Sequence, residues 1–263
     1  MAKLLQTLIP LALLLVVAAT TARSQTTSFT YDFYGSQPTD LTYQGDAHFP
    51  SETTFLRLAN PQTASIGRVL YSTPIQFWEE GAQVDFETTI NFIITPNGDA
   101  TPADGLTFFI APVGSTIPVS SSGGNFGIFG SSGTSPSVFA VEFDTYTNGA
   151  WDPDYRHVGI DIGSRASSNT TEVDGAIIGQ QVTARIDYEE ATKVISVAVA
   201  AGSKTYEVSY VYDLSTLVDQ KVQVGLSAAT GEYVATHDVV SWYFTSTLVH
   251  TAANAAANIR QYV

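Results

Sequence analysis

The stretch VFAVEFDTYTNGAWDPDYRHVGIDIGS, residues Val138 to Ser164, decides the fold. Its first half has the period of two that a β-strand shows, with apolar residues on one face and the carboxylates Glu142 and Asp144 on the other. A polar turn follows, and a new apolar run begins after His157. The stretch therefore predicts two β-strands joined by a turn, with two acids side by side on one face.

The acids of this stretch predict a metal centre. Two carboxylates at positions i and i+2 repel each other and resist desolvation unless a cation lies between them. One ligand set mixes oxygen and nitrogen and suits manganese or another transition metal: Glu142, Asp144, Asp152 and His157. A second set contains only oxygen, including a backbone carbonyl of the turn, and suits calcium: Asp144, Asn148 and Asp152. We predict two adjacent cations bridged by Asp144 and Asp152; the alternative is an acidic loop beside an unrelated histidine.

The motif EFDTY-T-N-GAW-DP-DYR-H-VGID resembles the metal-binding signature of the legume lectins, the family of concanavalin A and the pea and peanut agglutinins. In that family the Glu, both Asp and the His hold manganese, and the two Asp, the Asn and the carbonyl of the aromatic residue hold calcium. Carried over, that carbonyl belongs to Tyr146. The resemblance implies a lectin that depends on Ca2+ and Mn2+ and whose partners are glycans and glycoproteins. The loop between Asn148 and Asp152 varies in length within the family.

Residues 1–24 have the pattern of a secretory signal peptide, because Lys3 precedes an apolar run from Leu8 to Ala19 and small residues follow. The run is too short for a comfortable membrane span, and no later segment is long and apolar enough for membrane insertion. We expect cleavage after Ser24 and a protein of the secretory pathway, secreted or stored in a vacuole.

The chain that remains, about 240 residues, is acidic and has no cysteine. Without Lys3 and Arg23 of the leader, nine Lys and Arg face 25 Asp and Glu, a formal net charge of −16. Such a surface repels nucleic acid and anionic membranes, so neither is expected as a partner. Stability without disulfides must come from sheet packing and bound metal.

Strand-like runs rich in β-branched and aromatic residues fill the chain, and Gly, Pro, Asn and Ser separate them. Besides the opening stretch, the runs are Ser28–Tyr34, Phe55–Leu58, Arg68–Phe77, Val84–Ile94, Leu106–Ala111, Val182–Tyr188, Lys193–Val199, Lys204–Tyr212, Val222–Ala228 and Asp238–Leu248. Only Leu214–Val218 looks helical, for a single turn.

No linker interrupts the runs, so we predict one all-β sandwich domain over residues 25–251. The resemblance implies the legume-lectin jelly roll, with a flat back sheet, a curved front sheet and a small top sheet. The Ala- and Asn-rich segment 252–263 is expected to be a flexible or processed tail.

Two further segments resemble parts of the family's sugar site. In ADGLTFFIAP, residues 103–112, the resemblance makes Asp104 the acceptor for two sugar hydroxyls and its peptide bond with Ala103 cis; on its own, Asp104 has the pattern of a turn residue. In GGNFGIF the backbone N–H of Gly124 would donate to a sugar hydroxyl, whereas the plain interpretation is a flexible loop. Asn148 would face both calcium and sugar, and the Tyr146 ring would stack on a pyranose or simply pack at the strand end.

On its own, the segment Thr230–Thr236 indicates only a turn that joins two strands. In the family its length helps set specificity, and this short form resembles that of mannose and glucose binders, with Glu232 and Tyr233 meeting the sugar. The alternatives are a galactose-type lectin and an arcelin-like defence or inhibitor protein with altered sugar binding. Assembly into a homodimer or homotetramer is expected to supply multivalency.

Catalysis is not expected. Sandwich glucanases resemble E-x-D-x-x-E on a strand, and here Thr147 stands where the third acid would be. His48, His237 and His250 have no ligand cluster near them in the sequence, and we expect them at the surface or at strand ends. Asn169 begins the only N-glycosylation sequon, and the family's usual tryptophan a few residues later is replaced by Val173.

Overall fold

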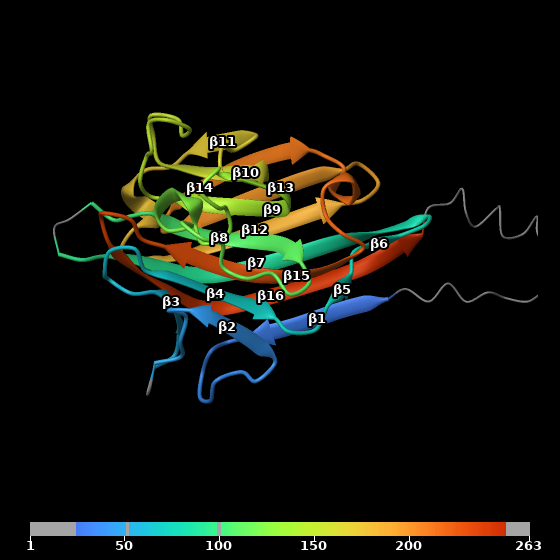
Figure 1. Ribbon diagram of the computed structural model, residues 1–263, viewed down its shortest axis with the longest axis horizontal. Coiled ribbons are helices and arrows are strands. Elements are labelled where there is room, and N and C mark those ends of the chain that lie inside the picture. Colours follow the sequence, from blue (N-terminus) through green and yellow to red (C-terminus); the bar gives the residue numbers. More distant parts are fainter. Residues whose placement is uncertain (1–24, 51–52, 99–100, 251–263) are drawn as a thin grey trace, which may run out of the picture.

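The computed structural model describes residues 25–50, 53–98 and 101–250, so the expected leader and tail lie outside the described residues. Two antiparallel sheets of eight strands each make up this part of the chain (Figure 1). The first sheet has the order β1 (Thr26–Tyr31), β16 (Ala235–His250), β7 (Ala82–Pro96), β12 (Gln181–Glu189), β13 (Val194–Ala201), β14 (Lys204–Val211), with β3 (Leu56–Ala59) on β16 and β6 (Trp78–Glu79) on β7.

The second sheet carries the stretch with which the sequence analysis began. Its order is β11 (Asn169–Glu172), β10 (His157–Ser164), β9 (Thr134–Asp144), β8 (Gly105–Pro112), β15 (Lys221–Ala229), β4 (Ile66–Tyr71), β2 (Leu41–Gly45), with β5 (Ile75–Gln76) on β15. The short strands β3, β5 and β6 branch from these two sheets instead of forming a separate third one in the described residues. The jelly-roll sandwich itself is confirmed.

The main core lies between the two sheets. Along β7 every second side chain is buried as far as Ile94, which is the alternation expected of a strand with one face in the core and the other toward water. Phe92 of β7 meets Phe143 of β9, with ring centroids 4.9 Å apart, and joins the sheets near the site. Burying such a ring contributes about 1.5–3 kcal/mol to the free energy of folding.

The strands β8, β9 and β15 are buried on both faces, which the sequence alternation does not explain. Residues 113–133, here called the covering segment, account for this burial. Its side chains Phe126, Ile128 and Phe129 pack against Phe109 and Ala140 in a second core cluster. The segment also contains the 3-10 turn η1 (Gly123–Asn125), so this cluster fixes a loop that borders the site.

Arg68 of β4 holds the covering segment in place through hydrogen bonds. It is almost fully buried, and its Nη1 donates to the carbonyls of Thr116 and Gly127 at 3.0 and 3.2 Å. Its guanidinium lies 4.5 Å from the centroid of the Phe109 ring. Burial lowers the pKa of Arg68 to about 10.

The long strands were predicted with errors of a few residues, and the single helical turn at Leu214 is the 3-10 turn η3 (Leu214–Thr216). The sequence analysis missed the short strands β2, β6 and β11, which carry little apolar alternation of their own. In the described part of the chain, no helix is long and apolar enough to cross a membrane.

Candidate metal centre and adjoining pocket

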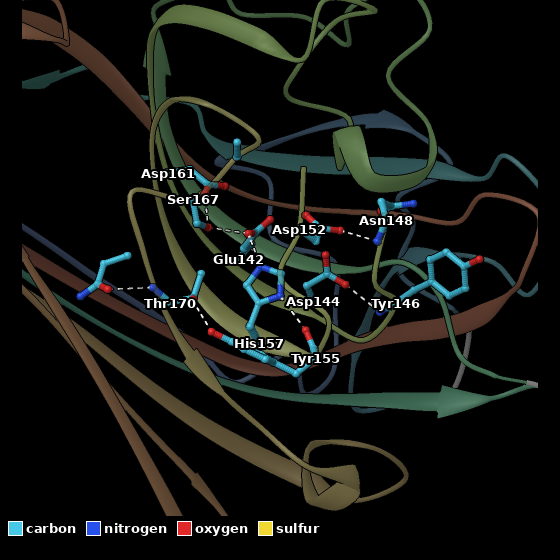
Figure 2. Close-up of polar contacts among 12 residues, drawn as sticks. Glu142, Asp144, Tyr146, Asn148, Asp152, Tyr155, His157, Asp161, Ser167 and Thr170 are labelled. Atoms are coloured by element: carbon cyan, nitrogen blue, oxygen red, sulfur yellow. Dashed lines mark hydrogen bonds and ion pairs between the residues drawn. The ribbon is translucent and has the colours of Figure 1, made fainter. Parts of the chain in front are cut away.

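The β9–β10 hairpin brings the predicted metal ligands together. In its register His157 lies opposite Asp144 and Gly159 lies opposite Glu142, so the three ligand side chains share one face of the sheet. Glu142, Asp144 and His157 are buried, and one ligand atom from each lies within 4.8 Å of the others. Figure 2 shows these side chains converging, with Asp152 and Asn148 beside them.

Hydrogen bonds hold the ligands in place. The Nε2 of His157 lies 2.8 Å from the Oε1 of Glu142, and its Nδ1 lies 3.3 Å from the carbonyl of Tyr155. The backbone N–H of Tyr146 donates to the Oδ1 of Asp144 at 2.7 Å. The backbone N–H of Asn148 donates to the Oδ2 of Asp152 at 2.6 Å, which closes the turn between the strands.

A test for bound cations comes from atoms with no partner. Glu142 Oε2, Asp144 Oδ2 and Asn148 Oδ1 are buried, and none of them accepts a hydrogen bond from the described residues. A buried, unpaired carboxylate oxygen costs several kcal/mol, on the order of a lost charged hydrogen bond or more. Hard oxygen atoms beside an imidazole nitrogen suit divalent cations. The donor set therefore fits metal ions.

Electrostatic repulsion among these acids points the same way. Burial, together with the charges of Glu142 and Asp152, raises the pKa of Asp144 well above its usual value. Burial raises the pKa of Asp152 to about 6. Burial alone would lower the pKa of His157, but its bond to Glu142 and the charges of Glu142 and Asp152 together outweigh burial and raise the pKa. The cluster without a cation thus favours protonated acids, and a bound cation would restore their charged forms.

Sequence reasoning missed two polar residues behind the centre, Ser167 and Asp161. The Oγ of Ser167 lies 2.6 Å from both Glu142 Oε1 and Asp161 Oδ1. A hydroxyl donates only one hydrogen, so Ser167 cannot donate a full hydrogen bond to both carboxyls at once. Burial and the charge of Glu142 raise the pKa of Asp161 well above its usual value. Gly159 leaves the room for Ser167, whose Oγ would lie 2.0 Å from a Cβ there.

A pocket of about 290 Å³ adjoins the metal centre. All six predicted saccharide contacts line it: Asp104, Gly124, Tyr146, Asn148, Glu232 and Tyr233. They come from the start of β8, the covering segment, the β9–β10 turn and the loop before β16, which are four separate parts of the chain. The rings of Tyr146 and Tyr233 meet with centroids 5.2 Å apart.

Asp104 forms the buried acid of this pocket. Its peptide bond with Ala103 is cis, as the resemblance implied. The Asp104 carbonyl accepts hydrogen bonds from the backbone N–H and the Oγ1 of Thr145, at 2.9 and 2.8 Å, which ties the acid to the end of β9. Its Oδ2 is buried without a partner. Burial and the charge of Asp152 raise the pKa of Asp104 to about 7, although the N–H of Gly231 acts in the opposite direction.

Two glycines let the backbone come close to these polar groups. A Cβ on Gly124 would lie 2.4 Å from the Oδ1 of Asn148, and a Cβ on Gly231 would lie 3.0 Å from the Oδ2 of Asp104. Gly231, Trp151, Asn125 and Arg165 also line the pocket, and sequence reasoning did not single them out. No motif marks them, because the fold alone brings them together.

The remaining predicted residues lie away from the centre. Asn169 is exposed at the start of β11, the edge strand, and its Nδ2 donates to the carbonyl of Ser209 at 2.8 Å. Val173, at the position of the family's tryptophan, is buried in the main core. His48 and His250 are exposed. His237, expected at the surface or a strand end, is the third residue of β16 and is fully buried.

Comparison with known proteins gives one consistent family. The legume lectin domain model matches residues 26–260. Agglutinin-2 of Cladrastis kentukea is 38% identical over 258 residues, which cover 91% of this chain and 88% of that protein. Peanut lectin with a nine-residue peptide aligns with a TM-score of 0.81 at 34% identity, over 86% of this chain and all of that one. Lectin UEA-II in complex with galactose aligns with a TM-score of 0.77 at 37% identity, over 84% of this chain and 98% of that one. With this sandwich, metal centre and pocket, the chain belongs to the legume lectin family of carbohydrate-binding proteins.

Proposed function

We propose that this protein is a non-catalytic, calcium- and manganese-dependent lectin for mannose and glucose. The observation that carries the proposal is the pocket over the metal centre, where the buried Oδ2 of Asp104 has no partner among the described residues. Sugar hydroxyls are donors that pair with such atoms and would relieve their desolvation.

The two cations would divide the ligands as the resemblance implies. Manganese would be held by Glu142, Asp144, Asp152 and His157, and calcium by Asp144, Asp152, Asn148 and the Tyr146 carbonyl. Their role is to neutralise the acids and to fix the β9–β10 turn. Asn148 and Asp104 then need no reordering when sugar arrives, so less affinity is lost to entropy.

Each pocket residue would have a defined task toward the sugar. Asp104 would accept from the 4- and 6-hydroxyls, Asn148 would pair with the 4-hydroxyl, and the Gly124 N–H would donate to the 3-hydroxyl. The Tyr146 ring would stack on the apolar face of the pyranose. Glu232 and Tyr233 would close over the 5–6 edge, and the contact of Tyr233 with Tyr146 supports that position.

A galactose-type lectin is the second candidate. Lectin UEA-II is 37% identical and carries galactose, and winged bean acidic lectin, 36% identical, carries methyl-α-D-galactose. The mannose/glucose-specific lectin of Centrolobium tomentosum is 35% identical, so overall identity does not separate the two classes. We favour mannose and glucose because of the short loop Thr230–Thr236. An axial 4-hydroxyl would leave one polar group of the pocket unpaired, at a cost of about 1–3 kcal/mol.

Titration calorimetry with methyl α-mannoside and methyl α-galactoside, in calcium and manganese, tests the proposal. Tighter binding of the mannoside supports it. Tighter binding of the galactoside supports the second candidate and leaves the lectin function standing. If neither glycoside binds, and a glycan array shows no bound protein with or without calcium, the protein is an arcelin-like relative that has lost sugar binding.

The biological setting is also a proposal. We infer secretion to the cell exterior or a vacuole, a glycan on Asn169, and assembly into a homodimer or homotetramer. The exposed position of Asn169 on the edge strand supports the glycan. Multivalency across such an assembly would raise weak monosaccharide affinity to useful strength. Sedimentation of the protein before and after glycosidase treatment measures both features.

A further inference from the structure

One cationic side chain borders the pocket. Among its lining residues in the described chain, Arg165 alone is positively charged, and Asp104 and Glu232 are the acids. The whole sequence has only 11 Lys and Arg against 25 Asp and Glu. A cation at this place in such an acidic chain calls for a physical reason.

Arg165 is held in one position. It directly follows β10, and its backbone N–H donates to the Gly133 carbonyl at 3.0 Å. Its guanidinium carbon lies 3.4 Å from the centroid of the Trp151 ring, and its Nη1 donates to the Oδ1 of Asn125 at 2.9 Å. Gly133 leaves space for this side chain, because a Cβ there would lie 2.5 Å from the Arg165 Nε. The side-chain entropy of Arg165 is therefore already lost before any ligand binds.

The guanidinium keeps unused donors. Its Nε and Nη2 donate to no atom of the described residues, and no carboxylate of those residues lies within the 4.0 Å of an ion pair with it. The charge of Arg165 lowers the pKa of Asp152, but the Oδ2 of Asp152 already accepts a hydrogen bond from the N–H of Asn148. A partly buried arginine without a counter-ion, fixed beside a pocket, suits an anion with paired oxygens.

We propose that Arg165 binds an anionic substituent, a sulfate or a carboxylate, that the saccharide carries on its 3-oxygen. This inference rests on the proposed function, which gives the 3-hydroxyl to Gly124. Arg165 bonds to Asn125, the residue after Gly124, and all three residues line the pocket, so the guanidinium lies on the Gly124 side of the site.

The acids of the metal centre do not oppose this assignment once cations are bound. Glu142, Asp144 and Asp152 carry three negative charges when ionised, and two divalent cations carry four positive ones. When both cations are bound, the net charge of the metal centre next to the pocket therefore changes from negative to weakly positive. The long-range repulsion of the acidic chain is screened within about 8 Å at physiological salt.

Titration calorimetry of the metal-loaded protein tests the proposal with matched ligands. The probes are the methyl glycoside that binds best, its 3-O-sulfate, and its 3-O-carboxymethyl ether, which separate the sulfate from the carboxylate. We expect at least one anionic derivative to bind about tenfold more tightly than the neutral glycoside, since a charged, bidentate hydrogen bond is added. This preference should shrink as salt is raised.

Three variants show which residue gives the preference. Arg165→Gln should reduce the ratio of anionic to neutral affinity to about one, and Arg165→Lys should keep part of it because the charge remains without the planar fork. The control Arg185→Gln removes an exposed arginine of β12 and should leave the ratio unchanged. The proposal is overturned if the wild type shows no preference for either anionic derivative, or if Arg165→Gln keeps it. Binding of the neutral glycoside reports separately on the proposed function.

Discussion

At the scale of single residues, burial decides what each polar group can do. Asp104 and His237 are both almost fully buried, and both have side-chain atoms without a partner. Asp104 borders a pocket, so a ligand can supply the missing partner. His237 is on β16 between β3 and β7, opposite Ala59 and Ile94, and its ring nitrogens have no hydrogen-bond partner among the described residues.

The first prediction concerns Asp104→Asn. An amide offers one acceptor oxygen where the carboxylate offers two, and it carries no charge. Because charged hydrogen bonds contribute about 1.5–3 kcal/mol each, sugar affinity should fall by more than tenfold. The metal content and the melting temperature of Asp104→Asn should stay unchanged. The control variant Asp187→Asn, at an exposed position, should also keep its metal content and melting temperature. Calorimetry and metal analysis of both variants measure sugar affinity, stability and metal content. Unchanged sugar affinity in Asp104→Asn would show that the sugar site lies elsewhere.

The second prediction concerns His237 and acid. Burial lowers the pKa of His237 to about 3, against about 6.5 when unfolded. Between these values the unfolded chain binds more protons than the folded one, so stability falls as pH drops from about 6.5 toward 3. At 1.36 kcal/mol per pKa unit, this one residue should remove on the order of 4 kcal/mol across that range.

The variant His237→Phe keeps the ring and removes the titration. Its melting temperature should fall less between pH 7 and pH 4 than that of the wild type, measured by calorimetry in the same buffers. A wild type and a variant that lose stability in parallel would show that His237 does not contribute to acid sensitivity.

Residue types predicted much of the site, and the limit of that prediction is physical. Glu142, Asp144 and His157 could be placed together because strand alternation fixes which side chains share a face. Arg165 and Trp151 could not, because their meeting depends on the path of the turn between β9 and β10, which the sequence leaves open.

At the scale of elements, the strands with regular alternation were predictable and the covering segment was not. In β7 and β12 the period of two shows directly which residues enter the core. In the covering segment, residues 113–133, the apolar side chains follow no period, so the sequence suggests a flexible loop. Its true role is to bury the outer face of β8 and β9 and to hold η1 at the pocket.

The third prediction tests that role with Phe129→Ala. Phe129 is fully buried in the second core cluster, and its truncation should cost about 3–5 kcal/mol of stability. Because η1 carries Gly124, sugar affinity should fall as well, whereas the metal ligands lie on β9 and β10 and should keep their ions. The control Phe244→Ala removes an equally buried ring from β16 and should lower stability without changing sugar affinity. Equal sugar affinity in both variants would contradict the prediction.

At the scale of the whole molecule, the β-sandwich is a rigid support for the metal centre, whose acidic side chains repel one another. The sequence predicted the two-layer fold because strand-like runs fill the chain and no linker interrupts them. It did not show how β3, β5 and β6 branch, because two to four residues carry too little pattern to give a register. The buried acids add unfavourable charge to this fold, and bound cations are what would make their burial stable.

The fourth prediction follows from that balance. Removal of metal with a chelator at pH 7 should lower the melting temperature and abolish sugar binding, while circular dichroism still shows the β-sandwich. Ions that bind only the folded chain stabilise it by RT ln(1 + [L]/Kd), about 2.7 kcal/mol at a hundredfold excess over Kd. Without them, Glu142, Asp144 and Asn148 keep buried oxygen atoms that lack a partner among the described residues, and we expect the β9–β10 turn to become less ordered. Adding back calcium and manganese should restore both the melting temperature and sugar affinity. A chelated sample, free of metal by elemental analysis, that melts and binds the glycoside like the untreated protein would contradict the two-cation assignment.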